Sequence, residues 1–340
     1  MKATTSLLRT SLCTDRMSLW KCSGPTVTGI SACTVHSHAT FRSAIFLAWA
    51  IIYVSGQNRR IFLLTSKVIF KMMTADKDKF KEKLLGHLSQ YLCDIQDSDG
   101  NWTVKGFINI FKNIYTISLD TKVISKVLEI MLFPKIQQFA IENDFELILS
   151  KEQNFYPDIS FIDKKSEEKI ALDIKSTYRK SKTSASGFTL GAFTGYFRNR
   201  SSKKDITFPY GEYKKHYVLG IVYTKQDDRV DEYKIYTIAE LTRILSVIKD
   251  TEFILQEKYK IATDRPGSGN TKNIGSTTKM EELRDGTGIF SKYGVEIFDD
   301  YWMYYQTRDM AQLLELPKPP YRNIKEYFEY KQGAKSDKND

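Results

Sequence analysis

Two short stretches in which polar and apolar residues alternate constrain the fold of this chain more than any other feature. Residues 158–162 and 169–175 each alternate as a strand with one buried face should, and a charged turn separates them. The pattern predicts an antiparallel hairpin. In its second strand, Asp173 and Lys175 leave the same face of the sheet. The apolar residues of that strand point into the core: Ile170, Leu172 and Ile174.

The hairpin brings two carboxylates together. Asp158, which follows Tyr156 and Pro157, opens the first strand and can approach Asp173 across the ladder. Two carboxylates this close repel unless a cation lies between them, and oxygen ligands suit a hard ion such as Mg²⁺. Lys175 could neutralise charge on a pentavalent phosphate or orient a water. The set predicts metal-assisted phosphodiester hydrolysis, although a solvated surface hairpin would carry the same residue types.

A long helix is predicted upstream of the hairpin. Asp120 is suited to cap its N-terminus, and Glu129 lies within it as a possible third acid. Between the helix and the hairpin, residues 150–155 form a polar loop whose amides could reach base edges or phosphates. The predicted apolar stripe of the helix consists of Val123, Val127, Ile130 and Met131.

A glycine-rich loop at residues 266–276 carries many hydrogen-bonding side chains. Its spacing fits neither the phosphate-binding G-x-x-x-x-G-K-[ST] loop nor the dinucleotide-binding G-x-G-x-x-G turn. Asn can form two hydrogen bonds with adenine and Thr methyls can touch thymine methyls, so reading of the DNA major groove is physically sensible. Considered alone, the loop also suits an ordinary surface turn.

From about Met73 to its C-terminal region, the chain resembles the type II restriction endonucleases of the EcoRV type, within the PD-(D/E)xK nuclease superfamily. Many ordered matches carry this resemblance, among them the acids of the hairpin and the glycine-rich loop. The matching segments are 120–125 (DTKVIS), 153–154, 156–158, 170–175 (IALDIK), 188–191, 198–199, 216, 220, 222–224, 267–271 (GSGNT), 273–276, 288–290 (GIF) and 300–302.

The resemblance implies a role for each site residue. Asp158 and Asp173 would be catalytic carboxylates that bind the metal, with the main-chain carbonyl of Ile174 as a further ligand. Lys175 would be the catalytic lysine, and Glu129 an auxiliary catalytic and metal-binding acid. DNA contacts would come from a minor-groove loop, a phosphate contact after the catalytic strand and a major-groove recognition loop: Gln153, Asn154, Thr177, Gly267, Ser268, Gly269, Asn270, Thr271, Lys272 and Asn273.

The resemblance also implies the substrate, the cofactor and the partners. Such enzymes are homodimers that use Mg²⁺ to cut a palindrome in double-stranded DNA bluntly at its centre, which suits a twofold protein on a twofold sequence. A cognate DNA methyltransferase of the same restriction-modification system would protect the host without direct contact. The protein would be cytoplasmic and have no membrane association.

Three departures from the family pattern affect the expected base sequence and leave the catalytic residues intact. Glu152 replaces a Gln in the first loop, Phe155 replaces a His, and Lys272 replaces a Thr in the recognition loop. Each bidentate base contact is worth about 1–3 kcal/mol, so one altered side chain can shift the preferred sequence. The predicted target is therefore GATATC or a close relative.

Two other interpretations remain. A structure-specific repair or junction nuclease could use the same acids, but the recognition loop argues against it. A catalytically inactive DNA-binding protein is the third possibility, which the intact Asp158, Asp173 and Lys175 make less favourable.

The net charge of +10 gives little information about DNA binding. Residues 1–72 hold nine Lys or Arg and one acid, whereas the other 268 residues hold 42 basic and 40 acidic ones. An apolar run at residues 44–54 is shorter than the roughly 20 residues that span a bilayer. We expect residues 1–72 to be an over-extended translation that is not part of the working protein, and residues 331–340 to be a disordered polar tail.

Residues 73–330 are expected to form one α/β domain that catalyses and binds DNA, with a mixed central β-sheet flanked by helices as in restriction endonucleases. His87 and His216 stand apart from other candidate groups and are interpreted as structural. The predicted elements include a hairpin near 101–117, strands near 145–149, 157–162, 169–175 and 216–224, a helix at 238–248 and a strand at 253–262.

Overall fold

The computed structural model describes residues 78–226, 231–267 and 272–336. The leader expected at residues 1–72 and positions 268–271 of the recognition loop lie outside this part of the chain. Within the described part, no helix is both long enough and apolar enough to cross a bilayer.

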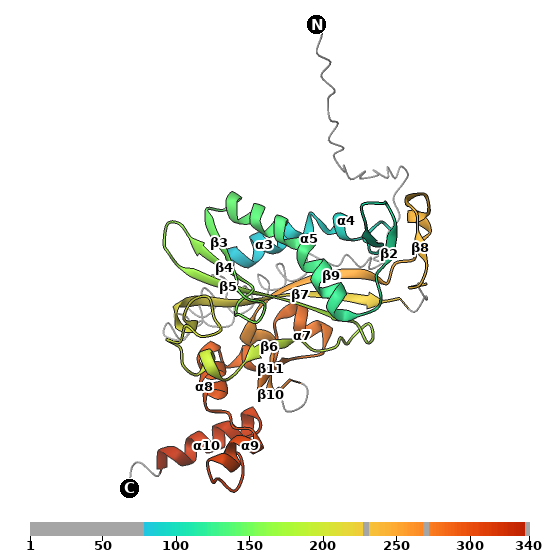
Figure 1. Cartoon of the computed structure of the whole chain (residues 1–340). Coiled ribbons are helices and arrows are strands. Elements are labelled where there is room, and N and C mark those ends of the chain that lie inside the picture. The colour runs from blue at the N-terminus through green and yellow to red at the C-terminus, as the bar shows by residue number, and fades with distance from the viewer. Residues whose placement is uncertain (1–77, 227–230, 268–271, 337–340) are drawn as a thin grey trace, which may run out of the picture. The chain divides into compact units, whose positions relative to one another are not determined.

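Five strands form the central sheet, in the order β3-β4-β5-β7-β9. Strands β3, β4 and β5 are antiparallel neighbours, β5 and β7 run parallel, and β7 and β9 are antiparallel. The sheet is therefore mixed and flanked by helices, and β4–β5 is the predicted hairpin (Figure 1). The bounds are β3 Phe145–Leu149, β4 Ile159–Asp163, β5 Lys169–Tyr178, β7 Tyr213–Lys225 and β9 Ile248–Glu257.

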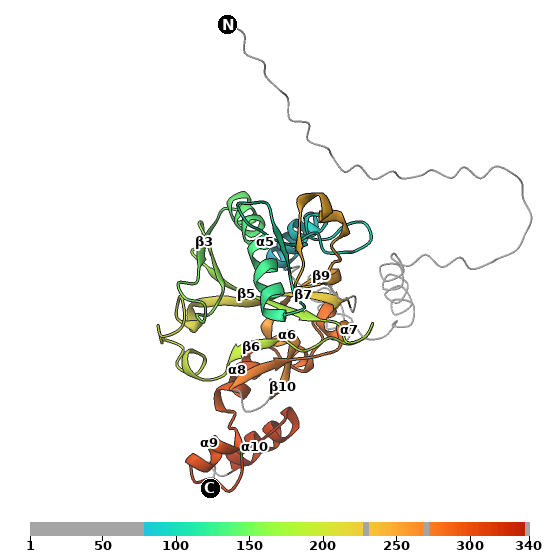
Figure 2. The same ribbon diagram turned by 45° about the vertical axis from the view of Figure 1, so that its right-hand side comes forward.

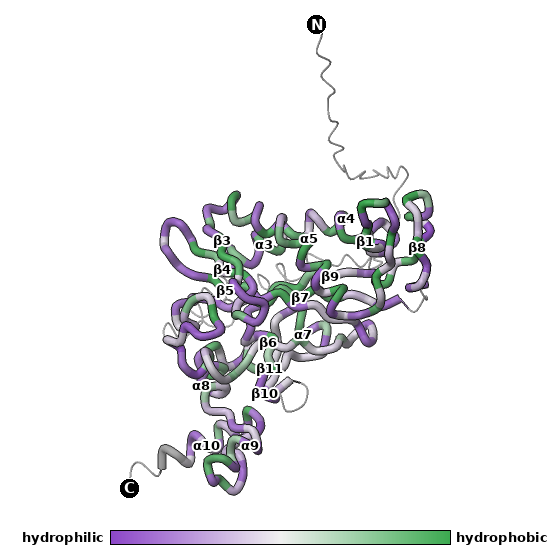
Figure 3. The backbone as a smooth tube through the Cα atoms, viewed as in Figure 1, coloured by the Kyte–Doolittle hydropathy of each residue, from purple (hydrophilic) through white to green (hydrophobic). Residues whose placement is uncertain are grey.

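Helices cover one face of the central sheet: α3 (Lys79–Ser89), α4 (Leu92–Ile95) and α5 (Thr121–Glu142). Leu172 of β5 packs in one core with Leu84 and Leu128 from these helices. Strands β3 and β4 are largely hydrophobic, as Figure 3 shows. The opposite face of β5 carries Ala171 and Asp173, which are buried beneath a second set of elements.

The N-terminus of α5 is capped as predicted, but its buried face differs from the predicted stripe. Asp120 Oδ1 accepts the main-chain N–H groups of Lys122 and Val123 over 2.7 and 3.1 Å. Of the predicted stripe, Ile130 is exposed and the other three residues are only partly buried. The fully buried residues follow the four-residue spacing one position later: Ile124, Leu128, Leu132 and Ile136. Long-range packing decides which face of α5 is buried. Because Leu128 and Leu132 face the core, Glu129 lies on the flank of the helix.

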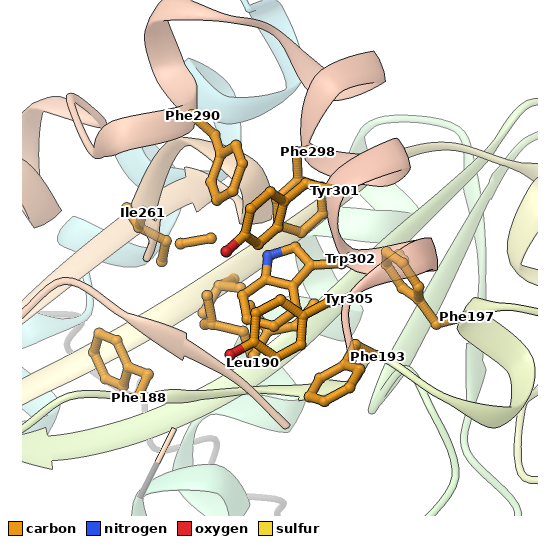
Figure 4. Packing of buried hydrophobic residues seen from close by; sticks show 14 of the residues in the cluster. Phe188, Leu190, Phe193, Phe197, Ile261, Phe290, Phe298, Tyr301, Trp302 and Tyr305 are labelled. Atoms are coloured by element: carbon orange, nitrogen blue, oxygen red, sulfur yellow. The ribbon is translucent and has the colours of Figure 1, made fainter. Parts of the chain in front are cut away.

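A second sheet, β6-β11-β10, lies on the other side of the central sheet from α5 (Figure 2). Its core is aromatic, and Trp302 packs there with Phe193, whose ring centroid is 5.1 Å away (Figure 4). The elements are β6 (Thr189–Ala192), α6 (Lys258–Ile261), β10 (Ala262–Pro266), β11 (Asn273–Ser276), α7 (Met280–Asp285) and α8 (Val295–Tyr304), with short 3₁₀ helices η1 (Gly195–Phe197), η2 (Tyr210–Glu212) and η4 (Ile289–Lys292).

A third, small sheet contains the hairpin predicted near residues 101–117. Its strands are β1 (Gly106–Ile108), β2 (Ile114–Thr116) and β8 (Ile235–Tyr236), in the order β1-β2-β8.

The helix predicted at 238–248 is wrong beyond its first turns. Only a 3₁₀ helix forms, η3 (Ile238–Arg243), because Ile244 adopts an extended backbone and Ile248 pairs with Lys225 as the first residue of β9. The strand predicted at 253–262 is likewise interrupted, since the four-residue helix α6 separates β9 from β10.

The C-terminal region consists of α9 (Arg308–Leu313) and α10 (Ile324–Ser336). The first six residues of the expected tail are therefore helical, and residues 337–340 lie outside the described part. Lys331 supports this end of α10, because its Nζ lies 2.7 Å from Asp300 Oδ2 and its charge stands over the Tyr327 ring.

Candidate active site

The β4–β5 hairpin brings the two predicted acids together. Ile159 pairs with Leu172 in the ladder, so Asp158, one residue earlier, lies beside Asp173 and Ile174. The main-chain N–H of Ile174 donates to Asp158 Oδ2 over 2.6 Å. This bond fixes the Asp158 side chain against the neighbouring strand.

The ammonium of Lys175 contacts all three oxygen groups that were assigned to a metal. Its Nζ lies 2.8 Å from Asp173 Oδ2, 3.6 Å from Asp158 Oδ2 and 3.2 Å from the carbonyl oxygen of Ile174. The three oxygens therefore converge on one cation.

Burial and mutual repulsion make simultaneous ionisation of both carboxyl groups unfavourable. Burial, together with the nearby charge of Asp173, raises the pKa of Asp158 to about 7. Burial would lower the pKa of Lys175, but the Asp173 and Asp158 carboxylates outweigh it and raise that pKa. A site that keeps one carboxyl partly protonated near neutral pH gains stability when a further cation arrives.

The donor set fits a hard divalent cation. Two carboxylates and a main-chain carbonyl are oxygen ligands of the kind that Mg²⁺ prefers. Asp158, Asp173 and the Ile174 carbonyl would hold such an ion, which would supply the positive charge that Lys175 now provides to these oxygens.

Asp158, Ile174 and Lys175 line a cleft of about 780 Å³, whereas Asp173 is buried and is not among the lining residues. Glu129 lines this cleft together with Asp158 and Lys175, but its Oε1 is paired with Lys126 Nζ at 2.9 Å. Among the described residues, no group of three or more His, Cys, Asp or Glu side chains is placed to hold a metal jointly. Glu129 therefore stands at the cleft and apart from the two aspartates.

Only some of the residues predicted to contact DNA lie at the cleft. Gln153 lines the cleft, but Asn154 is not among its lining residues. Thr177 is buried, and its hydroxyl donates to the carbonyl of Ser186 over 2.8 Å, so it is already engaged inside the protein. The recognition loop is described only at its base, where the Gly267 N–H donates to the Asn273 carbonyl over 2.8 Å.

Several residues of the site carried no clear signal in the sequence. Lys126 lies three residues before Glu129 on the same helix, a spacing that could have suggested the ion pair. Phe188 and Thr189 also line the cleft, although only the family match drew attention to them. Lys258, the residue after β9, is buried against the ring of Tyr156, two residues before Asp158, and had no local signal at all.

The two histidines are packed as the sequence interpretation expected. His216 Nδ1 lies 2.9 Å from the Tyr156 hydroxyl, and its ring stacks on Tyr210 with a centroid distance of 4.0 Å. Burial lowers the pKa of His216 well below its usual range. His87 Nε2 lies 2.9 Å from the carbonyl of Lys135, far along the chain from the acids.

Comparisons with known proteins identify the family. The model of the family described as "Restriction endonuclease EcoRV" matches residues 98–332. The "Type II restriction enzyme EcoRV" of Escherichia coli is 36% identical over 236 residues, which cover 68% of this chain and 92% of that enzyme. Among solved structures, the NlaIV restriction endonuclease is 12% identical with a TM-score of 0.35, over 70% of this chain and 89% of that one.

The family match covers well over half of the chain and includes the hairpin, the cleft and the recognition loop. The chain belongs to the EcoRV family of type II restriction endonucleases, which are DNA hydrolases.

Proposed function

We propose that the protein is a Mg²⁺-dependent endonuclease that cuts double-stranded DNA bluntly within a short palindrome, GATATC or a close relative. The observation that carries the metal-dependent chemistry is the convergence of Asp158, Asp173 and the Ile174 carbonyl on one positive charge. The similarity to the Escherichia coli enzyme supports the base sequence and the blunt cut.

The contacts at the site and the resemblance support a role for each residue. Asp158, Asp173 and the Ile174 carbonyl would hold Mg²⁺, which would polarise the scissile phosphate and lower the pKa of a bound water. Lys175 lines the cleft, so its ammonium can face the phosphate once it leaves these oxygens, and there it stabilises developing negative charge. Glu129 acts from the cleft wall as an auxiliary acid.

DNA recognition is assigned to two loops. Gln153 and Asn154 would contact the minor groove and the backbone, with Thr177 as a phosphate contact. The major groove would be read by residues 267–273: Gly267, Ser268, Gly269, Asn270, Thr271, Lys272 and Asn273. Lys272 adds a positive charge near the phosphates, whereas Glu152 in the first loop adds a negative one.

An exposed apolar surface supports a homodimer. The β1–β2 hairpin, β8 and η3 expose large side chains that a second copy of the chain could cover. We name this set the hairpin surface: Phe107, Ile108, Ile110, Phe111, Tyr115, Tyr233, Ile235, Ile238, Leu241 and Leu245. A cytoplasmic enzyme of a restriction-modification system, with a cognate methyltransferase protecting the host DNA, completes the proposal.

Incubation with plasmid and Mg²⁺, followed by mapping of the DNA ends, tests the proposal. Discrete blunt fragments that end within one palindrome are expected, and Asp173→Ala should abolish them while DNA binding persists. A smear without base preference would favour a structure-specific or repair nuclease. Intact plasmid under all metal conditions would favour a DNA-binding protein without catalysis.

A further inference from the structure

A buried lysine lies beneath the catalytic hairpin without a hydrogen-bond partner. Lys258, the first residue of α6, is 2% exposed, and within the described part of the chain no group bonds its Nζ. Three aromatic rings surround the ammonium, with centroids 4.9 Å away for Tyr156, 5.5 Å for Tyr210 and 5.6 Å for Phe197. Cation–π attraction compensates only part of the hydration that an ammonium loses on burial.

Lys258 is therefore costly for the stability of the fold. Burial lowers the pKa of Lys258 to about 8, and the charge of Asp173 is the strongest influence that opposes this shift. A cavity of about 50 Å³ adjoins the residue and has room for ordered water. An apolar side chain of similar length would fill the same space without the desolvation cost.

Contacts of Lys258 connect it to the segment that leads into Asp158 and to β6. Tyr156, whose ring it faces, precedes Pro157 and Asp158 in the chain and stacks on Tyr196 with a centroid distance of 5.3 Å. On β6, a Cβ added to Gly191 would lie 3.5 Å from Lys258 Nζ, so the strand that borders the cleft passes close to the ammonium. Lys258 thus lies where the catalytic hairpin and β6 meet.

We infer that Lys258 is a positioning residue of the catalytic site, whose fixed positive charge aligns Asp173 and the segment from Tyr156 to Asp158 for metal binding. This inference rests on the proposed Mg²⁺-dependent function. It explains why an ammonium without a hydrogen-bond partner is buried against the ring of Tyr156, two residues before Asp158. Lys258 would therefore increase the catalytic activity and lower the stability of the fold.

Replacement of Lys258 by Met tests the inference, because Met keeps the length and removes the charge. Without metal, the Tm of Lys258→Met should equal or exceed that of the wild type. Mg²⁺ binding, measured by calorimetry, should weaken by about tenfold, and single-turnover cleavage at saturating Mg²⁺ should slow by a similar factor. Lys81→Met is the matched control, since Lys81 is a half-buried lysine bonded to Gln256 away from the cleft.

Each outcome is decisive. Unchanged or tighter Mg²⁺ binding by Lys258→Met overturns the inference, and so does a fall in Tm that accounts for the loss of activity. If Lys258→Met does not fold, Lys258→Gln, which is polar and uncharged, must show the same weakening of Mg²⁺ binding. A wild-type enzyme that binds Mg²⁺ and cuts no DNA contradicts the proposed function, whereas the calorimetric comparison still decides the role of Lys258.

Discussion

The main-chain N–H of Ile174 donates to Asp158 Oδ2 over 2.6 Å, so the carboxylate that begins one strand is held by the backbone of the next. The same residue directs its carbonyl oxygen to Lys175 Nζ at 3.2 Å. Ile174 therefore orients an acid through its N–H and presents its carbonyl oxygen to the ammonium that this acid also approaches, and this arrangement underlies the predictions for the site.

Asp158→Asn should stabilise the metal-free protein at pH 8. The folded pKa of about 7 lies above the ordinary value of 3.8, so ionisation costs the folded state stability as pH rises through this interval. Asn keeps an acceptor for the Ile174 N–H and carries no charge. Thermal unfolding in EDTA should show a higher Tm than the wild type at pH 8, with a difference that shrinks toward about pH 4. Equal Tm values at pH 8 would contradict this expectation.

Lys175→Met should destabilise the metal-free protein and make its stability strongly dependent on metal. Removal of the ammonium leaves Asp173 buried without its cation, a change that costs about 3–5 kcal/mol for buried pairs. Unfolding followed in EDTA and in Mg²⁺ should show that the ion recovers more stability in the variant than in the wild type. Cleavage should be lost with DNA binding retained. A metal-free Tm equal to that of the wild type would show that the ion pair between Lys175 and Asp173 does not stabilise the fold.

Glu129→Gln should reduce cleavage far less than Asp173→Ala. Glu129 lies at the cleft but is paired with Lys126 and apart from the two aspartates, so we expect a loss of about tenfold or less. Single-turnover cleavage at several Mg²⁺ concentrations measures the effect. A loss as large as that of Asp173→Ala would place Glu129 among the metal ligands of the DNA-bound enzyme.

Thr177→Val distinguishes an internal role from a phosphate contact. The Thr177 hydroxyl is bonded to the Ser186 carbonyl, and a buried carbonyl left without this partner costs about 1–3 kcal/mol. A lower Tm with an unchanged salt dependence of DNA affinity would identify an internal role. The opposite result, an unchanged Tm with a shallower salt dependence, would show that Thr177 contacts the backbone of the DNA.

The hairpin surface should be needed for dimer formation. Ile110 and Phe111 are 89% and 76% exposed, so the double substitution Ile110→Glu and Phe111→Glu should leave the fold of each chain intact. Sedimentation should then show a monomer, and cleavage of both DNA strands should fall. Leu313→Glu, at an 84% exposed position on α9, is the control and should stay dimeric. A dimer that survives the double substitution would place the interface elsewhere.

Local patterns predicted the catalytic hairpin well, because the acids, the turn and both strands lie within one short stretch of sequence. The α5 cap at Asp120 is local too, and its geometry matches the prediction. The buried face of α5 is set by the sheet and by α3, so its phase could not be derived from the helix alone. The same holds for residues 244–248, where pairing of Ile248 with Lys225 outweighs helix propensity.

Lys258 shows most clearly what the sequence could not reveal. A lysine at the end of a strand is usually solvated, and only contacts with Tyr156, Tyr210 and Phe197, distant in sequence, bury this one. Thr177 gives a second example, since the family match suggests a contact with DNA whereas the fold turns its hydroxyl toward Ser186.

The pairing of β11 with β6 connects the end of the proposed recognition loop to the border of the cleft. Asn273, at the end of the recognition loop, pairs with Ala192, and Gly275 pairs with Thr189, which borders the cleft. The base of the proposed recognition loop is thus joined through one pair of strands to the wall of the cleft. With base reading and cleavage as proposed, this short, irregular ladder would carry a shift of the loop to the wall of the cleft without involving the central sheet.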